Sequence, residues 1–136
     1  MAVICGSIAR SLGSSNRVWQ LSMMAGAMAR ARVLGVPVIL DGFIACSAAA
    51  ILHVLAPTAL DHCVAGHASA ETAHTRLLTA LNKSPLLSLG LRLGEGSGAA
   101  LAWPLLQSAC SILRDMASFE SAGVSEKSDS APATVA

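Results

Sequence analysis

One carboxylate set among three glycines is the strongest chemical signal in this sequence. Residues 91–98 read Leu-Arg-Leu-Gly-Glu-Gly-Ser-Gly, so Gly94, Gly96 and Gly98 surround Glu95. Glycine lacks a Cβ and adopts positive φ easily, which lets a ligand approach the main chain while the Glu95 carboxylate projects toward it. The apolar run that follows predicts a helix whose first N–H groups face the same space and suit an anion such as a phosphate. A simple tight turn before a helix is the alternative explanation.

A second cluster combines imidazole, thiol and carboxylate groups, namely Asp61, His62, Cys63, His67 and His74. Such groups bind zinc, but their spacing matches no standard finger or metalloprotease pattern. A second possibility for this cluster is a nucleophilic cysteine paired with a histidine. Cys63, however, lacks a nearby lysine or arginine that would stabilise its thiolate. We therefore expect no metal and no cofactor, with His67 as a capping residue and His74 on the surface of a helix.

The elements that would position these groups follow from the apolar pattern. Residues 18–32 are rich in alanine and methionine and contain no proline, which favours a buried helix. The branched apolar run at 35–40 predicts a strand buried on both faces, and residues 43–55 predict a second helix. This order is typical of a parallel crossover unit, in which ligands bind at the carboxyl ends of the strands. Asp41 and Gly42 fall at that edge.

The second half of the chain predicts two further helices. Residues 58–65 fit either a short helix or a strand. Ser69 is a favoured N-cap for a helix that ends near residue 81, with Glu71 in its first turn. The last helix is expected over 97–118, with one apolar face packed in a core. That face consists of Leu101, Leu105, Ala109, Ile112, Leu113 and Met116.

Composition limits the domain organisation and the partners. The chain has 136 residues, the size of one domain, and a formal net charge of +1 without a basic cluster, which argues against nucleic acid binding. Its four cysteines are widely spaced in apolar surroundings, typical of reduced, buried thiols in a cytoplasmic protein. We expect residues 18–123 to form the domain, with 1–17 unassigned and 124–136 a disordered tail.

Two uncharged stretches, 42–60 and 96–113, raise the alternative of a membrane protein. Each is close in length to the roughly 20 residues that span a bilayer core. Both contain proline and several polar residues, and the flanking charges show no strong orientation bias. Buried helices of an α/β layer are the better explanation, so we expect no membrane partner.

Three blocks of sequence together resemble one enzyme family. Residues 36–44 read Val-Pro-Val-Ile-Leu-Asp-Gly-Phe-Ile, residues 67–71 read His-Ala-Ser-Ala-Glu, and residues 91–100 contain the glycine-rich motif. In their order and intervals they look like the C-terminal part of nicotinate-nucleotide:dimethylbenzimidazole phosphoribosyltransferase, over about residues 19–125. The resemblance implies an α/β fold, as a helix-rich C-terminal fragment of a Rossmann-like parallel-sheet domain.

The resemblance also implies an activity. Enzymes of this family transfer phosphoribose from nicotinate mononucleotide to 5,6-dimethylbenzimidazole, giving nicotinate and the α-ribazole 5′-phosphate used for the lower ligand of cobalamin. By position, Glu95 would be the general base, and a buried carboxylate would suit that task. Leu93 would contact the aromatic base, and Gly42, Ser69 and Gly98 would line the nucleotide and its phosphate. The implied partners are the two substrates and either a second copy or a missing N-terminal part.

The chain also departs from the family pattern. Arg17-Val18-Trp19-Gln20 stands where the family has a glycine pair and an acid, Gly66 replaces a serine, and Ala73 replaces a glycine. The N-terminal majority of the family's chain, with a lysine and a glutamate of the nucleotide site, has no counterpart. A parallel sheet of one or two strands would leave unpaired edges and marginal stability. The alternative is therefore an inactive, truncated homologue that binds at most a nucleotide or a partner.

Overall fold

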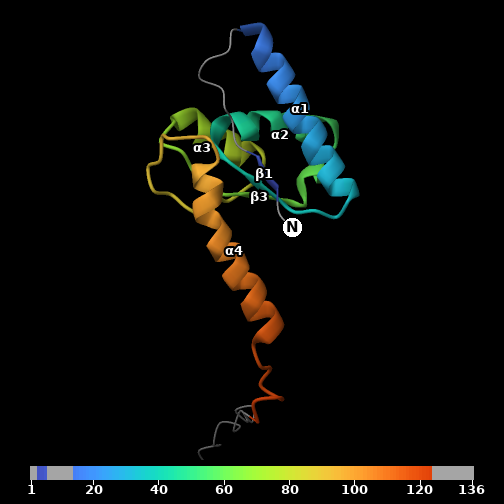
Figure 1. Ribbon diagram of the computed structural model, residues 1–136, viewed down its shortest axis with the longest axis vertical. Helices are drawn as coiled ribbons and strands as arrows, with labels where there is room; N and C mark the ends of the chain where they lie inside the picture. The colour runs from blue at the N-terminus through green and yellow to red at the C-terminus, as the bar shows by residue number, and fades with distance from the viewer. Residues whose placement is uncertain (1–2, 6–13, 124–136) are drawn as a thin grey trace, which may run out of the picture. The chain divides into compact units, whose positions relative to one another are not determined.

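The computed structural model describes residues 3–5 and 14–123, with side chains from residue 18 onward (Figure 1). The tail expected at 124–136 lies outside the described residues. The chain divides into two compact units, Met1–Leu105 and Leu106–Ala136. All the strands and the candidate site belong to the first unit. In the second unit, every described side chain beyond Leu106 is exposed.

The described part of the chain contains a parallel sheet of three short strands. These are β1 (Val3–Cys5), β2 (Val38–Leu40) and β3 (Cys63–Ala65), in the order β1-β2-β3. All three residues of β2 are buried, as predicted for a strand covered on both faces. The ambiguous segment at 58–65 divides into a 3-10 turn, η1 (Pro57–Leu60), and β3. β1 lies in the stretch left unassigned, because a three-residue strand is too short for periodicity to detect.

Four helices accompany this sheet in the described residues: α1 (Ser14–Val33), α2 (Gly42–Leu55), α3 (Thr72–Ala80) and α4 (Ser97–Asp115). The α/β class expected from the sequence is confirmed, with helices as the major component. α1 begins four residues earlier than predicted, at a Ser-Ser-Asn run within the unassigned residues 1–17. Serine and asparagine are common both in loops and at helix starts, so they do not separate the two.

The core lies between β2 and the helices that pack beside it. Ala45, Ala48 and Ala49 of α2 are fully buried, and their small side chains allow close approach of neighbouring backbones. Met28 of α1 and Leu40 of β2 belong to the same buried cluster, together with residues of β3, η1 and α3. α2 packs against both α1 and α3. This core holds in place the carboxyl ends of β2 and β3.

The apolar face of α4 is not part of a core, contrary to the prediction. Leu101 and Leu105 are about half exposed, and Leu113 is 88% exposed. The buried positions of α4 are its small residues Gly98, Ala99 and Ala102. Periodicity showed that α4 has an apolar face. Burial of that face depends on what packs against it, and within the described chain only the small residues of α4 are buried. Cys110, expected to be buried, is likewise exposed.

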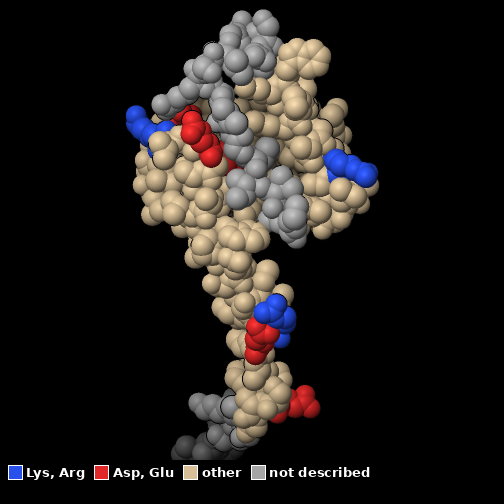
Figure 2. All heavy atoms as spheres, in the orientation of Figure 1, with Lys and Arg blue, Asp and Glu red and all other residues tan. Residues whose placement is uncertain are grey.

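Two further expectations from the sequence concern membrane-spanning helices and clusters of basic residues. None of the described helices is both long enough and apolar enough to cross a membrane. On the face drawn in Figure 2, Lys and Arg side chains lie apart from one another and uncharged residues make up most of the surface. This distribution agrees with the absence of a basic cluster from the sequence.

Candidate active site

A pocket of about 480 Å³ lies at the carboxyl ends of β2 and β3. Residues 41–44, where β2 leads into α2, form one side of it. His67, Ser69 and Glu71, from the segment between β3 and α3, form a second side, and residues 91–95 form the third. The first two segments meet because the carboxyl ends of parallel strands share one edge of a sheet, and residues 91–95 immediately precede α4.

The structure brings four of the five predicted site residues to this pocket. Glu95, Gly42, Ser69 and Leu93 all line it, whereas Gly98 is absent from the lining. Glu95 is exposed, contrary to the expectation of a buried carboxylate, since it belongs to a surface loop. Leu93 is 72% exposed. The roles assigned to these residues stay predictions, but the four residues line one pocket.

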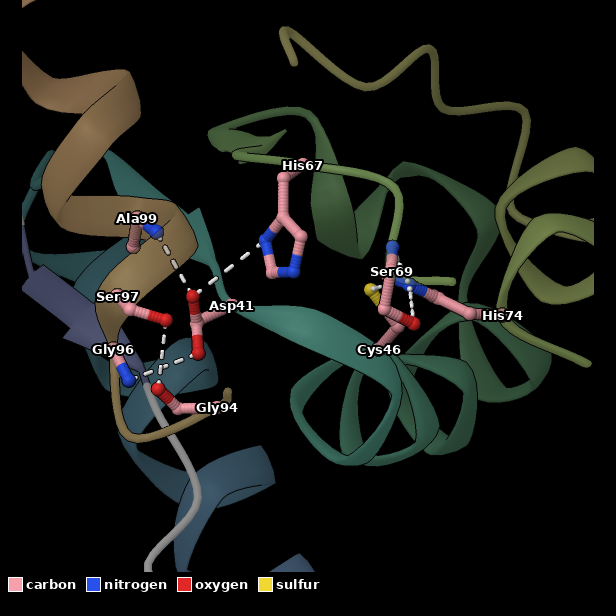
Figure 3. Close-up of polar contacts among 9 residues, drawn as sticks. All are labelled: Asp41, Cys46, His67, Ser69, His74, Gly94, Gly96, Ser97 and Ala99. Carbon is pink, nitrogen blue, oxygen red and sulfur yellow. Dashed lines mark hydrogen bonds and ion pairs between the residues drawn. The ribbon is translucent and has the colours of Figure 1, made fainter. Parts of the chain in front are cut away.

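Asp41 connects the end of β2 to the start of α4 (Figure 3). Its carboxylate is buried, and Oδ2 accepts a hydrogen bond of 2.9 Å from the Gly96 N–H. Oδ1 accepts another, of 2.8 Å, from the Ala99 N–H. A carboxylate suits this place because a helix begins with unpaired N–H groups and a positive dipole end. These two N–H groups are therefore not available to a phosphate, contrary to the sequence-based expectation for this helix.

Sequence reasoning placed Asp41 at the sheet edge but did not identify its capping role. The available signal was an acid at the end of a buried strand in a protein that also has an uncapped, glycine-led helix. That signal shows the need for a cap without showing which acid provides it. The contacts join residues 55 and 58 positions apart, so no local motif encodes them.

Gly98 allows the imidazole of His67 to lie directly against α4. A Cβ built at Gly98 would lie 1.8 Å from His67 Nδ1, which no real side chain could tolerate. His67 is 2% exposed, and its Nδ1 lies 3.6 Å from Asp41 Oδ1. Within the described residues this Nδ1 is buried without a hydrogen-bond partner, so His67 does not act as the expected capping residue. Gly98 therefore has a packing role in this structure.

His74 is fully buried, contrary to the surface position predicted for it. The Ser69 backbone N–H donates to His74 Nδ1 at 3.0 Å, and Ser69 Oγ lies 3.0 Å from the same atom (Figure 3). His74 Nε2 lies 3.3 Å from Cys46 Sγ. Burial lowers the pKa of His74, the charge of His67 lowers it further, and Glu71 and Asp41 act in the opposite direction.

Ser69 does not cap α3, contrary to the prediction. The helix begins at Thr72, its N-cap is Glu71, and the Glu71 side chain makes no capping hydrogen bond. Ser69 instead turns toward His74, five residues further along the chain. The sequence indicates that Ser69 hydrogen-bonds to a nearby group. Its partner is the imidazole of His74 and not an N–H group of the helix.

The loop that carries Glu95 has an unusual backbone. Gly94, Glu95 and Gly96 all have positive φ, of 81°, 60° and 86°. Ser97 closes the loop, since its Oγ donates to the Gly94 carbonyl oxygen at 2.8 Å. Glycine adopts this conformation freely, but for glutamate it costs about 1–2 kcal/mol. Such strain at a pocket carboxylate is typical of functional positions.

The second chemical cluster of the sequence is dispersed in the structure. No group of three or more metal-ligating side chains that could hold an ion occurs among the residues described. His62 Nε2 lies 2.9 Å from the carbonyl oxygen of Met28 and so joins the start of β3 to α1. His67 faces Asp41, and His74 faces Cys46. Closeness in sequence did not bring these groups to a common centre.

Comparisons with known proteins show which family this chain resembles. The family model described as Phosphoribosyltransferase matches residues 15–124. A protein of Roseobacter denitrificans named nicotinate-nucleotide–dimethylbenzimidazole phosphoribosyltransferase is 61% identical over 107 residues, which cover 79% of this chain and 32% of the relative. A protein of Ruegeria sp. with the same name is 62% identical over 107 residues, with the same coverage.

A solved structure is also similar to this chain. The crystal structure of the enzyme of this name from Thermus thermophilus matches with a TM-score of 0.74 and 45% identity, over 79% of this chain and 32% of that one. The chain thus spans about a third of the length of the relatives it matches. With the family model covering most of its length, the chain belongs to the nicotinate-nucleotide–dimethylbenzimidazole phosphoribosyltransferase family.

Proposed function

We propose that this chain forms part of an active site that transfers phosphoribose from nicotinate mononucleotide to 5,6-dimethylbenzimidazole. One observation carries the proposal: a single loop holds Glu95 at its tip in a pocket that Gly42, Ser69 and Leu93 also line. The names of the relatives support the choice of substrates. The products are nicotinate and α-ribazole 5′-phosphate, for cobalamin synthesis in the cytoplasm.

In the proposed reaction, Glu95 acts as the general base. One azole nitrogen of dimethylbenzimidazole attacks the anomeric carbon of the ribose as the bond from that carbon to the nicotinate nitrogen breaks. The Glu95 carboxylate takes the proton from the other azole nitrogen, so the product base is neutral and nicotinate leaves with the bonding electron pair. Glu95 is exposed in this chain and lines the pocket, so its carboxylate is accessible to a substrate bound there. Positioning of the two substrates supplies most of the remaining rate enhancement.

The pocket offers different chemistry to the two substrates. Leu93, with Phe43 and Ile44 of α2, provides apolar surface for the flat aromatic base. Gly42, at a positive φ of 69°, and Ser69 provide the side proposed for the nucleotide. Since Asp41 occupies two N–H groups at the start of α4, we propose that the nucleotide phosphate lies toward Gly42.

We further propose that full activity also requires a counterpart of the relatives' remaining length, or a second copy of this chain. The relatives are about three times as long as the matched segment, which covers 32% of them. The exposed apolar side chains of α1 and α4, among them Trp19 and Leu101, support association with another polypeptide. That polypeptide is either a second copy or a chain equivalent to the missing N-terminal part. The alternative function is an inactive homologue that binds only a nucleotide or a partner.

The direct test combines the purified chain with nicotinate mononucleotide and dimethylbenzimidazole. One reaction contains the chain alone, and another adds the N-terminal two-thirds of the Roseobacter denitrificans relative. Chromatography should detect α-ribazole 5′-phosphate in the second reaction, and Glu95→Gln should reduce its formation by about a hundredfold or more. Glu120→Gln changes an exposed glutamate outside the pocket and is the matched control. Nucleotide binding without product in either reaction would favour the inactive homologue.

A further inference from the structure

A line of three side chains runs from the pocket into the core, and the two inner ones have no role in the reaction proposed above. Ser69 lines the pocket, His74 is fully buried behind it, and Cys46 of α2 is fully buried behind His74. Figure 3 draws these three residues together, with His74 contacting Ser69 and Cys46. A buried imidazole needs partners for both ring nitrogens, and these neighbours supply them.

Hydrogen-bond accounting fixes the protonation state of this imidazole. The Ser69 backbone N–H can only donate, and it donates to His74 Nδ1 at 3.0 Å, so Nδ1 carries a lone pair and no proton. The single ring proton of the neutral imidazole is then on Nε2, which lies 3.3 Å from Cys46 Sγ, a weak acceptor. Ser69 Oγ lies 3.0 Å from the same unprotonated Nδ1, so in this contact the hydroxyl is the donor.

We propose that His74 is a positioning residue that holds the Ser69 hydroxyl as a hydrogen-bond acceptor toward the pocket. The serine proton is engaged by the imidazole, so the lone pairs of Oγ face the ligand. The ligand group at Ser69 is therefore a donor, such as a ribose hydroxyl, and not a phosphate oxygen. This inference rests on the proposed function and specifies which part of the nucleotide Ser69 contacts.

The surroundings of His74 maintain the neutral form that this role requires. The charged and titratable groups facing it are His67 after β3, Glu71 at the start of α3, Asp41 at the end of β2 and Cys46 on α2. Burial is the largest influence on the pKa of His74 and lowers it. A proton on Nδ1 would oppose the Ser69 N–H, two donors facing each other, and would remove both contacts to Ser69. Acidification should therefore release the serine.

The tautomer of His74 can be measured without any ligand. Long-range proton–nitrogen NMR of the full chain at neutral pH should show an unprotonated Nδ1 and a proton on Nε2. A proton on Nδ1, in either the other tautomer or the imidazolium, would reject the inference. This measurement is independent of whether the chain acts on nicotinate mononucleotide.

Two substitutions separate the two contacts of the imidazole. His74→Asn retains an acceptor close to the position of Nδ1, whereas His74→Gln extends its amide toward Cys46 and loses the Ser69 contacts. We expect the affinity for nicotinate mononucleotide to fall about tenfold in His74→Gln and about twofold or less in His74→Asn, as for loss of one hydrogen bond. His53→Gln, outside the pocket lining, is the matched control. Circular dichroism should show that each variant is folded.

Ligand and pH comparisons distinguish positioning from a merely structural role. His74→Gln should weaken binding of ribose 5-phosphate but not of inorganic phosphate. Acid should weaken nucleotide binding by the wild type, and the midpoint of this loss should match the midpoint of the His74 titration measured by NMR. His74→Asn should lack that pH dependence. Equal nucleotide affinity for wild type and His74→Gln would reject the inference. If the wild type binds no nucleotide although Nε2 carries the proton, the proposed function and the ligand contact both fail, while the tautomer assignment stands.

Discussion

Two groups of residues at the pocket are held by the chain in different ways. Asp41 and His67 of the lining, with Gly98 behind His67, are all buried and make contacts between segments far apart in sequence, and we call them the buried floor. Residues 91–95, which we call the exposed rim, include the exposed Leu93 and Glu95 and a strained backbone. The floor residues thus determine how α4 joins the sheet, whereas the rim residues carry groups that can meet a ligand.

The difference predicts that substitutions in the two groups have opposite effects. Changes in the floor should lower the free energy of unfolding, because packed groups have no room to move. Changes in the rim should affect activity and leave stability unchanged or higher, since strain in a functional loop opposes folding. The predictions below test this separation, beginning with the largest expected effect.

Gly98→Ala should be the most damaging single change. The new Cβ would fall 1.8 Å from His67 Nδ1 and within 2.4 Å of two ring carbons, so the imidazole or the helix must move. We expect a loss of about 3 kcal/mol in the free energy of unfolding, at the upper end for overpacking. Urea denaturation followed by circular dichroism measures it.

Gly26→Ala is the matched control for that substitution. Gly26 lies within α1, and among the described residues no heavy atom beyond the adjoining helix backbone lies within 4 Å of a Cβ built there. Alanine is the better helix former, so this change should raise the free energy of unfolding by about 0.5–1 kcal/mol. Equal effects of the two alanines would show that the Gly98 site relaxes easily and that the floor is not tightly packed.

Asp41→Asn should have the next largest effect. Asparagine keeps one oxygen acceptor but places an N–H donor opposite either the Gly96 or the Ala99 N–H. Loss of one charge-assisted hydrogen bond in a buried site should cost about 1.5–3 kcal/mol in the free energy of unfolding.

The control for this change is Asp61→Asn. Asp61 is exposed and makes a surface ion pair of 3.4 Å with Arg32, so its replacement should cost less than about 1 kcal/mol. Comparison of the two asparagine variants in urea isolates the effect of burial. If Asp41→Asn costs no more than Asp61→Asn, Asp41 does not secure the start of α4.

Glu95→Gly should separate stability from activity on the rim. Glycine adopts the positive φ of this position without strain, so relief should raise the free energy of unfolding by about 1 kcal/mol. Without a carboxylate, the variant should form no α-ribazole 5′-phosphate in the assay with the N-terminal part of a relative. Glu95→Gln should lose product formation without gaining stability. Retained product formation in the glycine variant would exclude Glu95 as the base.

The sequence predicted the elements whose pattern is local. The run at 38–40 indicated a buried strand because its branched apolar residues are continuous, and residues 18–32 and 43–55 indicated helices because they contain no proline. The glycine-rich motif led to Glu95 because a carboxylate among glycines is unusual in itself. The rule that strand ends share a sheet edge explains why Gly42 and Ser69, which follow β2 and β3, line one pocket. Leu93 and Glu95 follow no described strand, and the roles assigned to them came from the family resemblance.

Contacts between distant segments could not be predicted in this way. His74 was expected on a helix surface because histidine is polar, yet its partner Cys46 lies 28 residues earlier in the chain. Gly98 was assigned to a ligand because glycine permits close approach, and the group that approaches is His67 of the same chain. In each case residue type indicated a special contact without identifying the partner. The apolar face of α4 similarly indicated burial without indicating what would cover it.

The smallest expected effect is a pH dependence of stability at the base of the pocket. Burial, and then the charge of His67, lowers the pKa of His74 below its ordinary value of 6.5, which the unfolded chain retains. The unfolded chain therefore binds a proton first, so stability is full above pH 6.5 and falls as the pH decreases toward the lower folded pKa. Urea denaturation at about pH 7.5 and about pH 5.5 should show a smaller decrease for His74→Asn than for the wild type, while His53→Asn should follow the wild type. Equal decreases in all three proteins would assign the effect to other groups, and the buried imidazole would then add nothing to the acid sensitivity of the fold.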